Sequence, residues 1–113
     1  MAAIANLTID QGATFSSDVT VKDANNNAFD LTGYSASAKM AKGFSSTRTR
    51  TSITCTISTP ASSGVVTLSL TADQTSALDE GRYVYDLEIL QTSSSTITRV
   101  IEGIITVRPQ VTT

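Results

Sequence analysis

The sequence predicts an all-β fold, in which two antiparallel sheets pack face to face as a sandwich. Three observations lead to this prediction. Apolar residues alternate with polar ones along nearly the whole chain, which is the periodicity of half-buried strands. Threonine and serine make up about 30% of the 113 residues, and threonine, like valine and isoleucine, favours a pleated strand. Turn residues separate the alternating segments at fairly regular spacing, as is typical of small sandwiches.

A short motif near residue 80 predicts which kind of sandwich this is. The run from Asp79 to Tyr85 reads D-E-G-R-Y-V-Y. Immunoglobulin-like domains carry a tyrosine near the start of their sixth strand, and its hydroxyl bonds back to the backbone a few residues upstream. Tyr83 stands at this corner position, and Tyr85 stands where the sandwich cysteine of such domains usually lies. We therefore predict an immunoglobulin-like antiparallel β-sandwich of about seven strands, with one short helix before the sixth strand.

The first half of the chain is predicted to form three alternating segments. Gly12 interrupts the first segment, which is expected to continue beyond it as one strand. Asp23 to Asn27 forms a turn, because Asp and Asn bond their own backbone and tolerate left-handed conformations. Residues 42–51 are polar and basic, and predict a long hairpin or a bent edge. The apolar positions that mark the segments are Leu7, Ile9, Phe15, Val19 and Val21, then Tyr34, Ala36, Ala38 and Met40, then Ile53, Cys55 and Ile57.

The second half holds three further strands and the one helical signal. Thr71 and Gln74 have the spacing of a capping box, in which each side chain bonds the backbone N–H of the other residue. A short helix is therefore expected to begin here and to end near Leu78. Gly103 lies within the last strand, where glycine indicates a bulge or a closely approaching backbone. The strand markers are Val66, Leu68 and Leu70, then Tyr83, Tyr85, Leu87 and Ile89, then Ile97, Ile101, Ile105 and Val107, which share one phase.

Length and composition bound the remaining possibilities. The chain is expected to be a single domain over residues 1–113, with short extended ends. No basic-then-apolar start segment and no window of about 18 apolar residues occurs, so neither a secretory signal nor a membrane span is expected. The net charge of −2 argues against general nucleic-acid binding, which uses a basic face. The single cysteine excludes an internal disulfide, which fits assembly in a reducing cytoplasm.

Few residues are suited to catalysis. The chain has no histidine, and so lacks the commonest general base and the commonest metal ligand. Cys55 lies in an alternating strand and is interpreted as a core thiol rather than a nucleophile, because no imidazole can activate it. Asp73, Asp79 and Glu80 lie near one another, but their spacing matches no calcium-binding loop. We therefore predict no enzymatic activity, no cofactor and no metal site.

The basic residues concentrate in one short stretch. Lys39, Lys42, Arg48 and Arg50 are half of all Lys and Arg residues, and Phe44 lies among them. One interpretation is a docking loop for an acidic partner surface, in which Phe44 is an aromatic anchor. The other is a solvated loop that keeps the protein soluble, and both stay open. The two extended ends are further candidates for contact, because such ends can add to a neighbour's exposed sheet edge.

Five stretches together form a recognisable set. The set resembles small structural proteins of tailed bacteriophages, especially those of marine cyanobacterial phages. Immunoglobulin-like domains of this D-L-T-G type are also found in phage baseplate and fibre proteins. The resemblance spans nearly the whole chain and implies a virion protein, but it brings no catalytic residues. The stretches are Thr8–Phe15 (TIDQGATF), Asp30–Tyr34 (DLTGY), Gly64–Thr71 (GVVTLSLT), Gly81–Asp86 (GRYVYD) and Gly103–Val107 (GIITV).

The function expected from this resemblance is structural. The leading hypothesis is a capsid decoration, or cement, protein that binds the major capsid protein or other virion proteins on the outer surface of the shell. Many weak copies acting together would reinforce the shell through multivalency. An alternative is a tail, neck or baseplate adaptor or a receptor-binding component, and a homo-oligomer fits either role. A second alternative is a carbohydrate-binding β-sandwich module, against which stands the lack of tryptophan.

Overall fold

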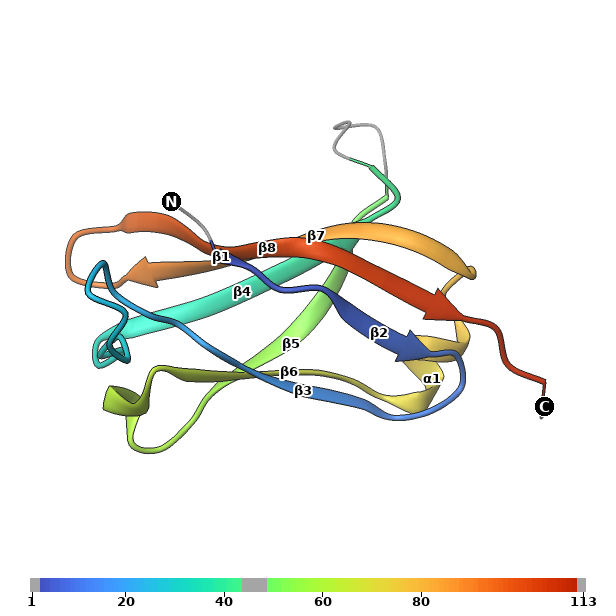
Figure 1. Cartoon of the computed structure of the whole chain (residues 1–113), viewed down its shortest axis with the longest axis horizontal. Coiled ribbons are helices and arrows are strands. Elements are labelled where there is room, and N and C mark those ends of the chain that lie inside the picture. Colours follow the sequence, from blue (N-terminus) through green and yellow to red (C-terminus); the bar gives the residue numbers. More distant parts are fainter. Residues whose placement is uncertain (1–2, 44–48, 112–113) are drawn as a thin grey trace.

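The computed structural model describes residues 3–43 and 49–111 and is built almost wholly of strands (Figure 1). A 3₁₀ turn at Ala61–Ser63 and one short α-helix complete it. None of the helices in the described ranges is long or apolar enough to cross a membrane. The elements are β1 (Ala3–Ile4), β2 (Leu7–Asp10), β3 (Phe15–Thr20), β4 (Tyr34–Ala41), β5 (Thr51–Ile57), β6 (Val65–Leu70), α1 (Ala72–Ser76), β7 (Gly81–Gln91) and β8 (Thr96–Arg108).

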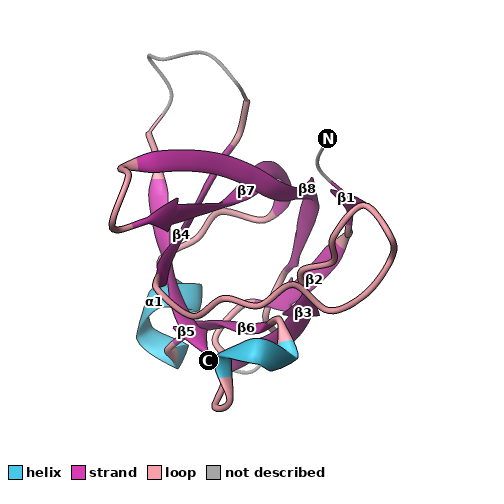
Figure 2. Cartoon of the chain, turned by 90° about the vertical axis from the view of Figure 1, so that its left-hand side faces the viewer, coloured by secondary structure: helices cyan, strands magenta, loops and turns pink. Residues whose placement is uncertain are grey.

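The strands form two layers around one core. One layer places β1 and β2 beside β8, followed by β7 and β4, and the other contains β5, β6 and β3. β5 belongs to both layers, because its first residues pair with β4 and its last residues pair with β6. The sheet therefore curls round on itself, as the end-on view shows (Figure 2). All ladders are antiparallel except those of β1 and β2, which run parallel to β8. This is an immunoglobulin-like sandwich, which confirms the predicted fold class.

The core consists of the alternating apolar positions that the sequence marks. Along β7, the four predicted inner residues Tyr83, Tyr85, Leu87 and Ile89 are all buried. They face the other layer, where the inward apolar residues of β3 and β6 are buried as well (Phe15, Val19, Val66, Leu68 and Leu70). Alternation of this kind buries one face of each strand and leaves the other in water. The side chains with no exposed surface are Ile9, Val66, Leu68, Leu87 and Ile105, together with Thr75.

Tyr83 forms the predicted corner at the start of β7. Its hydroxyl donates a hydrogen bond to the carbonyl oxygen of Asp79 at 2.9 Å, and its ring is buried. The ammonium group of Lys42 lies 4.9 Å from the ring centroid and donates to the carbonyl oxygen of Glu80 at 2.7 Å. The corner prediction is confirmed. Burial raises the pKa of the Tyr83 hydroxyl above its ordinary value.

We expect Tyr83→Phe to lower the free energy of unfolding by about 1 kcal/mol, because the carbonyl of Asp79 loses its partner while the ring stays in place. Equilibrium unfolding in urea measures this change. Tyr34→Phe is the matched control, since the ring of Tyr34 packs edge-on against Phe29 at 5.4 Å and the substitution keeps that contact. An equal loss in both variants would show that the corner bond contributes nothing of its own.

The Asp30–Tyr34 stretch folds into a tight turn that enters β4. The Asp30 carboxylate accepts hydrogen bonds from the backbone N–H of Thr32 at 3.0 Å and from its hydroxyl at 2.7 Å. Both bonds lower the pKa of the Asp30 carboxyl, and the bond from the Thr32 hydroxyl has the larger effect. Leu31 is buried in the core, and Gly33 has a φ of +82°, a conformation that favours glycine. The D-L-T-G motif is therefore a structural turn that anchors Leu31.

The predicted capping box is present at the start of α1. The N–H of Gln74 donates to the Thr71 hydroxyl at 3.2 Å, and the Gln74 side chain accepts from the N–H of Thr71 at 2.8 Å. The helix ends at Ser76, two residues before the expected end at Leu78. Leu78 instead turns into the core, where its side chain is buried.

The expectation of one continuous strand through Gly12 is wrong. β2 pairs with β8 in one layer, and β3 pairs with β6 in the other. Between them, Gly12 has a φ of +83° and the N–H of Ala13 donates to the carbonyl of Asp10, so the chain reverses. The hydroxyl of Thr75 holds this turn, since it accepts from the N–H of Gly12 at 3.1 Å. Alternation alone does not distinguish one long strand from two strands in different layers.

The last strand contains a bulge that changes its phase. Its ladder with β7 shifts register between Leu87 and Glu88, so that Leu87 pairs with Ile101 while Glu88 pairs with Arg99. One extra residue moves every side chain before it to the opposite face. Ile97 is accordingly 63% exposed, whereas the core residues of β8 beyond the bulge are buried. The single phase expected for all four residues therefore ends at the bulge.

Gly103 lies opposite a closely approaching backbone, as one of its two interpretations predicted. A Cβ atom built on Gly103 would lie 2.3 Å from the carbonyl oxygen of Ala5. The N–H of Ala5 donates to the carbonyl of Glu102 at 3.0 Å, and the Asn6 side chain accepts from the N–H of Ile104 at 3.1 Å. The residues between β1 and β2 are thus hydrogen-bonded to β8 on both sides of Gly103. A side chain at position 103 would clash with them, so glycine is required there.

Candidate functional site

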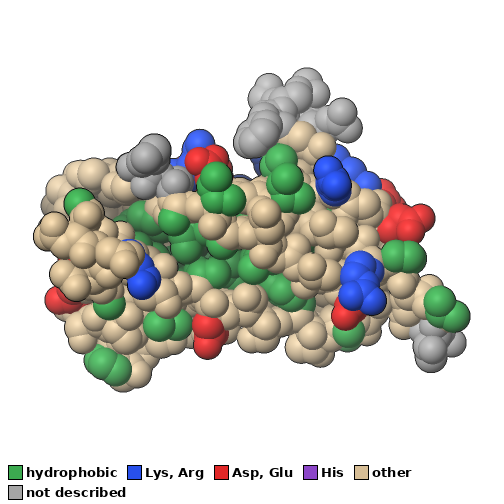
Figure 3. Space-filling model, in the orientation of Figure 1, with side chains coloured by type: hydrophobic (Ala, Val, Ile, Leu, Met, Phe, Trp, Pro, Cys, Tyr) green, Lys and Arg blue, Asp and Glu red, His purple; other side chains and the backbone are tan. Residues whose placement is uncertain are grey.

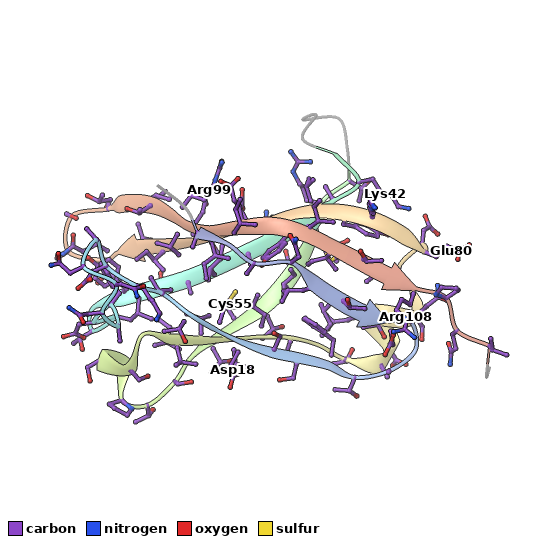
Figure 4. The ribbon with its side chains drawn as sticks, in the orientation of Figure 1. Asp18, Lys42, Cys55, Glu80, Arg99 and Arg108 are labelled. Atoms are coloured by element: carbon purple, nitrogen blue, oxygen red, sulfur yellow. The ribbon has the colours of Figure 1, made fainter. Side chains whose placement is uncertain are left out.

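The predicted docking residues are only partly brought together. Lys39 lies on the outer face of β4, opposite Asp86 of β7. Lys42 is held against the corner of its own chain, as described above, and Figure 4 shows it near Glu80. Arg50 donates to the carbonyl of Gly43 at 3.4 Å.

The other two members of that set, Phe44 and Arg48, lie outside the described residues. Lys42 stabilises the Tyr83 corner as well as contributing charge, so a change at this position would perturb the fold as well as any contact. Lys39 is the better residue with which to test docking, because it lies in the ladder of an exposed sheet face.

Charged residues of both signs cover the outer face of β4, β7 and β8. Lys39, Asp86 and Glu102 lie in register across the three strands, and Arg99 contacts Asp86 at 3.4 Å. Beside them lies a shallow hollow of about 300 Å³, which Arg50 also lines. Exposed ion pairs of this kind contribute little to stability, about 0–1 kcal/mol. They do give the face a charge pattern that a partner can match.

Other candidate groups lie apart from this face. In the described part of the chain, no three residues of the His, Cys, Asp and Glu types gather in a way that could hold a metal ion. Asp73 lies in the first turn of α1, where a negative charge favours the helix N-terminus. Asp79 provides the carbonyl that receives the Tyr83 hydroxyl. Both therefore have structural roles.

Cys55 lies on β5 with its thiol half-buried against the core, and burial raises the pKa of the thiol to about 11. At pH 8 the thiolate fraction is therefore roughly a hundredfold lower than for a cysteine of pKa 9.0. We expect iodoacetamide to alkylate the folded protein about tenfold more slowly than the urea-unfolded chain at this pH, because the greater nucleophilicity of a more basic thiolate offsets part of the lower thiolate fraction. Mass spectrometry of quenched samples measures both rates, and equal rates would contradict the assigned environment.

A second surface feature is a seam between the N-terminal segment and β3. Two hollows run along it, one of about 600 Å³ beside β1 and one of about 240 Å³ beside the β2–β3 turn. The larger hollow has an apolar floor to which Val19 and Ile101 contribute, and the green side chains in the centre of Figure 3 mark it. Ile4, which is 76% exposed, lies on its rim.

Reasoning from the sequence missed this seam. The extended N-terminal end was expected to be free to pair with a neighbour. It instead pairs with β8 of its own chain, and the buried hydroxyl of Tyr85 donates to the carbonyl of Ala5. No local pattern in the sequence marks the seam, because finding it requires knowing which strand edges stay unpaired.

Comparisons with known proteins bear on the fold only. No family model matches the chain, and no curated protein matches it. Among solved structures, the N-terminal domain of phage TP901-1 ORF48 is similar with a TM-score of 0.56 and 9% identity, over 92% of this chain and 85% of that one. At this identity the likeness shows a shared fold.

Two further solved structures are more distant in shape. The filamin domain of Lin-41 has a TM-score of 0.47 and 19% identity, covering 89% of this chain and 82% of that one. The natural killer cell receptor NKp44 has a TM-score of 0.42 and 14% identity, covering 96% and 99%.

Proposed function

We propose that this chain is a non-enzymatic structural protein of a bacteriophage particle, and that it decorates the outer surface of the capsid shell. The observation that carries the proposal is the fold shared with a domain of a phage protein, the N-terminal domain of TP901-1 ORF48, over most of both chains. The five motif stretches that resemble virion proteins point the same way. Two of them are structural turns or corners in the fold, at Asp30–Tyr34 and at Tyr83.

The fold suits a role in which many copies bind a lattice of identical subunits. A curled sandwich with its corner and turns fastened by hydrogen bonds is a rigid body, and rigid partners lose little entropy when they bind. The outer face of β4, β7 and β8 presents charges of both signs that a capsid surface can complement. Weak binding at each site then adds up over the shell through multivalency.

Counting the copies of this chain per purified phage particle tests the proposal. Quantitative mass spectrometry with isotope-labelled peptides gives the ratio of this chain to the major capsid protein. A decoration protein is expected on the order of hundreds of copies, because it follows the capsid lattice. A count of about three to twelve copies would contradict capsid decoration and would indicate a tail, neck or baseplate component.

A charge-reversal pair tests which face binds the shell. Lys39→Glu is expected to weaken binding to mature capsids, because it reverses the positive charge at the β4 end of the row that Lys39, Asp86 and Glu102 form. Arg108→Glu is the matched control, since it makes the same change in net charge six residues further along β8 than Glu102, away from the row that Lys39, Asp86 and Glu102 form. Co-sedimentation with capsids measures both variants. If both bind as the parent protein does, the face of β4, β7 and β8 is not the capsid contact.

A further inference from the structure

The seam between the N-terminal segment and β3 is bounded by two unpaired strand edges. One residue beyond the antiparallel ladder of β3 with β6, and in the same register, the N–H of Val21 donates to the carbonyl of Gly64, so the backbone of Val21 and of every second residue before it points toward β6. This direction alternates along a ladder, so the backbone groups of Ser16, Asp18 and Thr20 point away from β6. They face the seam.

The opposite wall has the same character. The N–H of Ala5 donates to Glu102, and the N–H of Gln11 donates to Arg108, so the odd-numbered residues of this segment bond to β8. The backbone groups of the even-numbered residues, such as Thr8, therefore point toward β3. Between the walls lies the larger hollow, of about 600 Å³, with Val19 and Ile101 at its floor.

We propose that this seam accepts one extended segment of a partner protein, which adds a strand between the N-terminal segment and β3. Two edges of unpaired backbone donors and acceptors are complementary to another strand, which can add to an exposed sheet edge through main-chain hydrogen bonds. The apolar floor takes every second side chain of that strand, because side chains of a strand alternate between its faces. The inserted strand also covers the exposed Ile4.

Asp18 places a negative charge on the open edge of β3, where its exposed carboxylate accepts a hydrogen bond from the Thr67 hydroxyl of β6 at 2.7 Å. If β3 paired with β3 of a second copy along its whole exposed edge, Asp18 would lie opposite Asp18, and like charges directly opposite are destabilising. A carboxylate on an open edge is a recognised protection against such self-pairing. The occupant is therefore a segment with apolar residues at alternate positions and a Lys or Arg opposite Asp18, rather than a second copy of this chain.

A displayed library of random nine-residue peptides, selected on the immobilised protein, tests the proposal. We expect enrichment of peptides that alternate apolar and polar residues and carry Lys or Arg in the polar phase. Selection on the Asp18→Lys variant should enrich Asp or Glu instead. The proposal is contradicted if the selected peptides show no alternating pattern. It is also contradicted if peptides selected on the parent protein and on the Asp18→Lys variant carry the same charges.

A pair of variants at Thr20 separates backbone pairing from side-chain contact. Thr20→Pro removes an N–H that points into the seam and leaves the bonds between β3 and β6 intact, a change that edge strands tolerate. We expect it to weaken binding of the selected peptide about tenfold, while Thr20→Ala stays within about twofold. Equal affinities for both variants would overturn strand addition.

Amide hydrogen exchange supplies a readout that is independent of these substitutions. The N–H groups of Ser16, Asp18 and Thr20 should exchange more slowly when the selected peptide is bound, and unchanged exchange would also contradict the proposal. A strand-accepting seam is independent of the capsid role proposed above, since it would serve a tail component equally. A low copy number therefore leaves this inference standing, and a failed selection leaves the capsid role standing.

Discussion

Replacing Gly103 with alanine is expected to lower the free energy of unfolding by about 1–3 kcal/mol, the usual range for an atom forced into a packed site. The new methyl group would lie 2.3 Å from the carbonyl oxygen of Ala5, so either the N-terminal segment or β8 must move. The N-terminal segment is the part that yields, because β1 has only two residues whereas β8 has thirteen. Thermal or urea unfolding measures the loss.

The same variant should change the titration of Tyr85. In the parent protein the hydroxyl of Tyr85 donates to the carbonyl of Ala5, and burial raises its pKa to about 12. When the segment moves away from Gly103, water reaches the hydroxyl and the pKa falls toward the ordinary value of 10.0. Ultraviolet titration of tyrosinate between pH 9 and about 12 follows this change.

Gly33→Ala is the matched control for both measurements. A methyl group at Gly33 has no atom within 4 Å, so its effect comes from the φ of +82° alone and amounts to about 1–2 kcal/mol. It should leave the pKa of Tyr85 unchanged. If Gly103→Ala also leaves that pKa at its raised value, the N-terminal segment has not moved and the close contact is relieved in another way.

The features that the sequence predicted correctly are those set by short-range hydrogen bonds. The Tyr83 corner joins residues four apart, and the Thr71 capping box joins residues three apart. In each case the required residue types and their spacing are visible in one short window. The inner face of β7 was also predictable, because eleven residues of regular alternation leave one consistent phase.

The features that escaped prediction depend on contacts between distant residues. The layer change at Gly12 depends on Thr75, which is 63 positions away. The bulge that exposes Ile97 depends on the register with β7, and no residue type in the window marks it. Part of the candidate site fails for the same reason: Lys42 reads as a loop charge, but its partner is the carbonyl of Glu80, 38 residues on. The seam depends on which strand edges remain unpaired, which no local pattern contains.

Thr75→Val is expected to lower the free energy of unfolding by about 1–3 kcal/mol, the range for leaving buried polar groups without partners. Thr75 has no exposed surface, and its hydroxyl accepts from the N–H of Gly12 at 3.1 Å and donates to the carbonyl of Ala13 at 2.9 Å. Valine has the same shape and fills the same space. Both backbone groups of the turn would therefore lose their partner while the packing stays unchanged, and urea unfolding measures the loss.

Two further variants separate the hydroxyl from its surroundings. Thr75→Ser keeps the hydroxyl and removes a methyl group, so it should lose about 1 kcal/mol, less than the valine variant. Ser76→Ala removes an exposed hydroxyl that bonds only within α1, to the carbonyl of Ala72, and should change stability by less than about 0.5 kcal/mol. If the serine variant is less stable than the valine variant, the methyl group of Thr75 contributes more than its hydroxyl. Packing, and not the hydrogen bond, would then hold α1 against the turn at Gly12. Because that turn fixes where β2 and β3 diverge, the same result would also remove Thr75 as the support for one end of the seam.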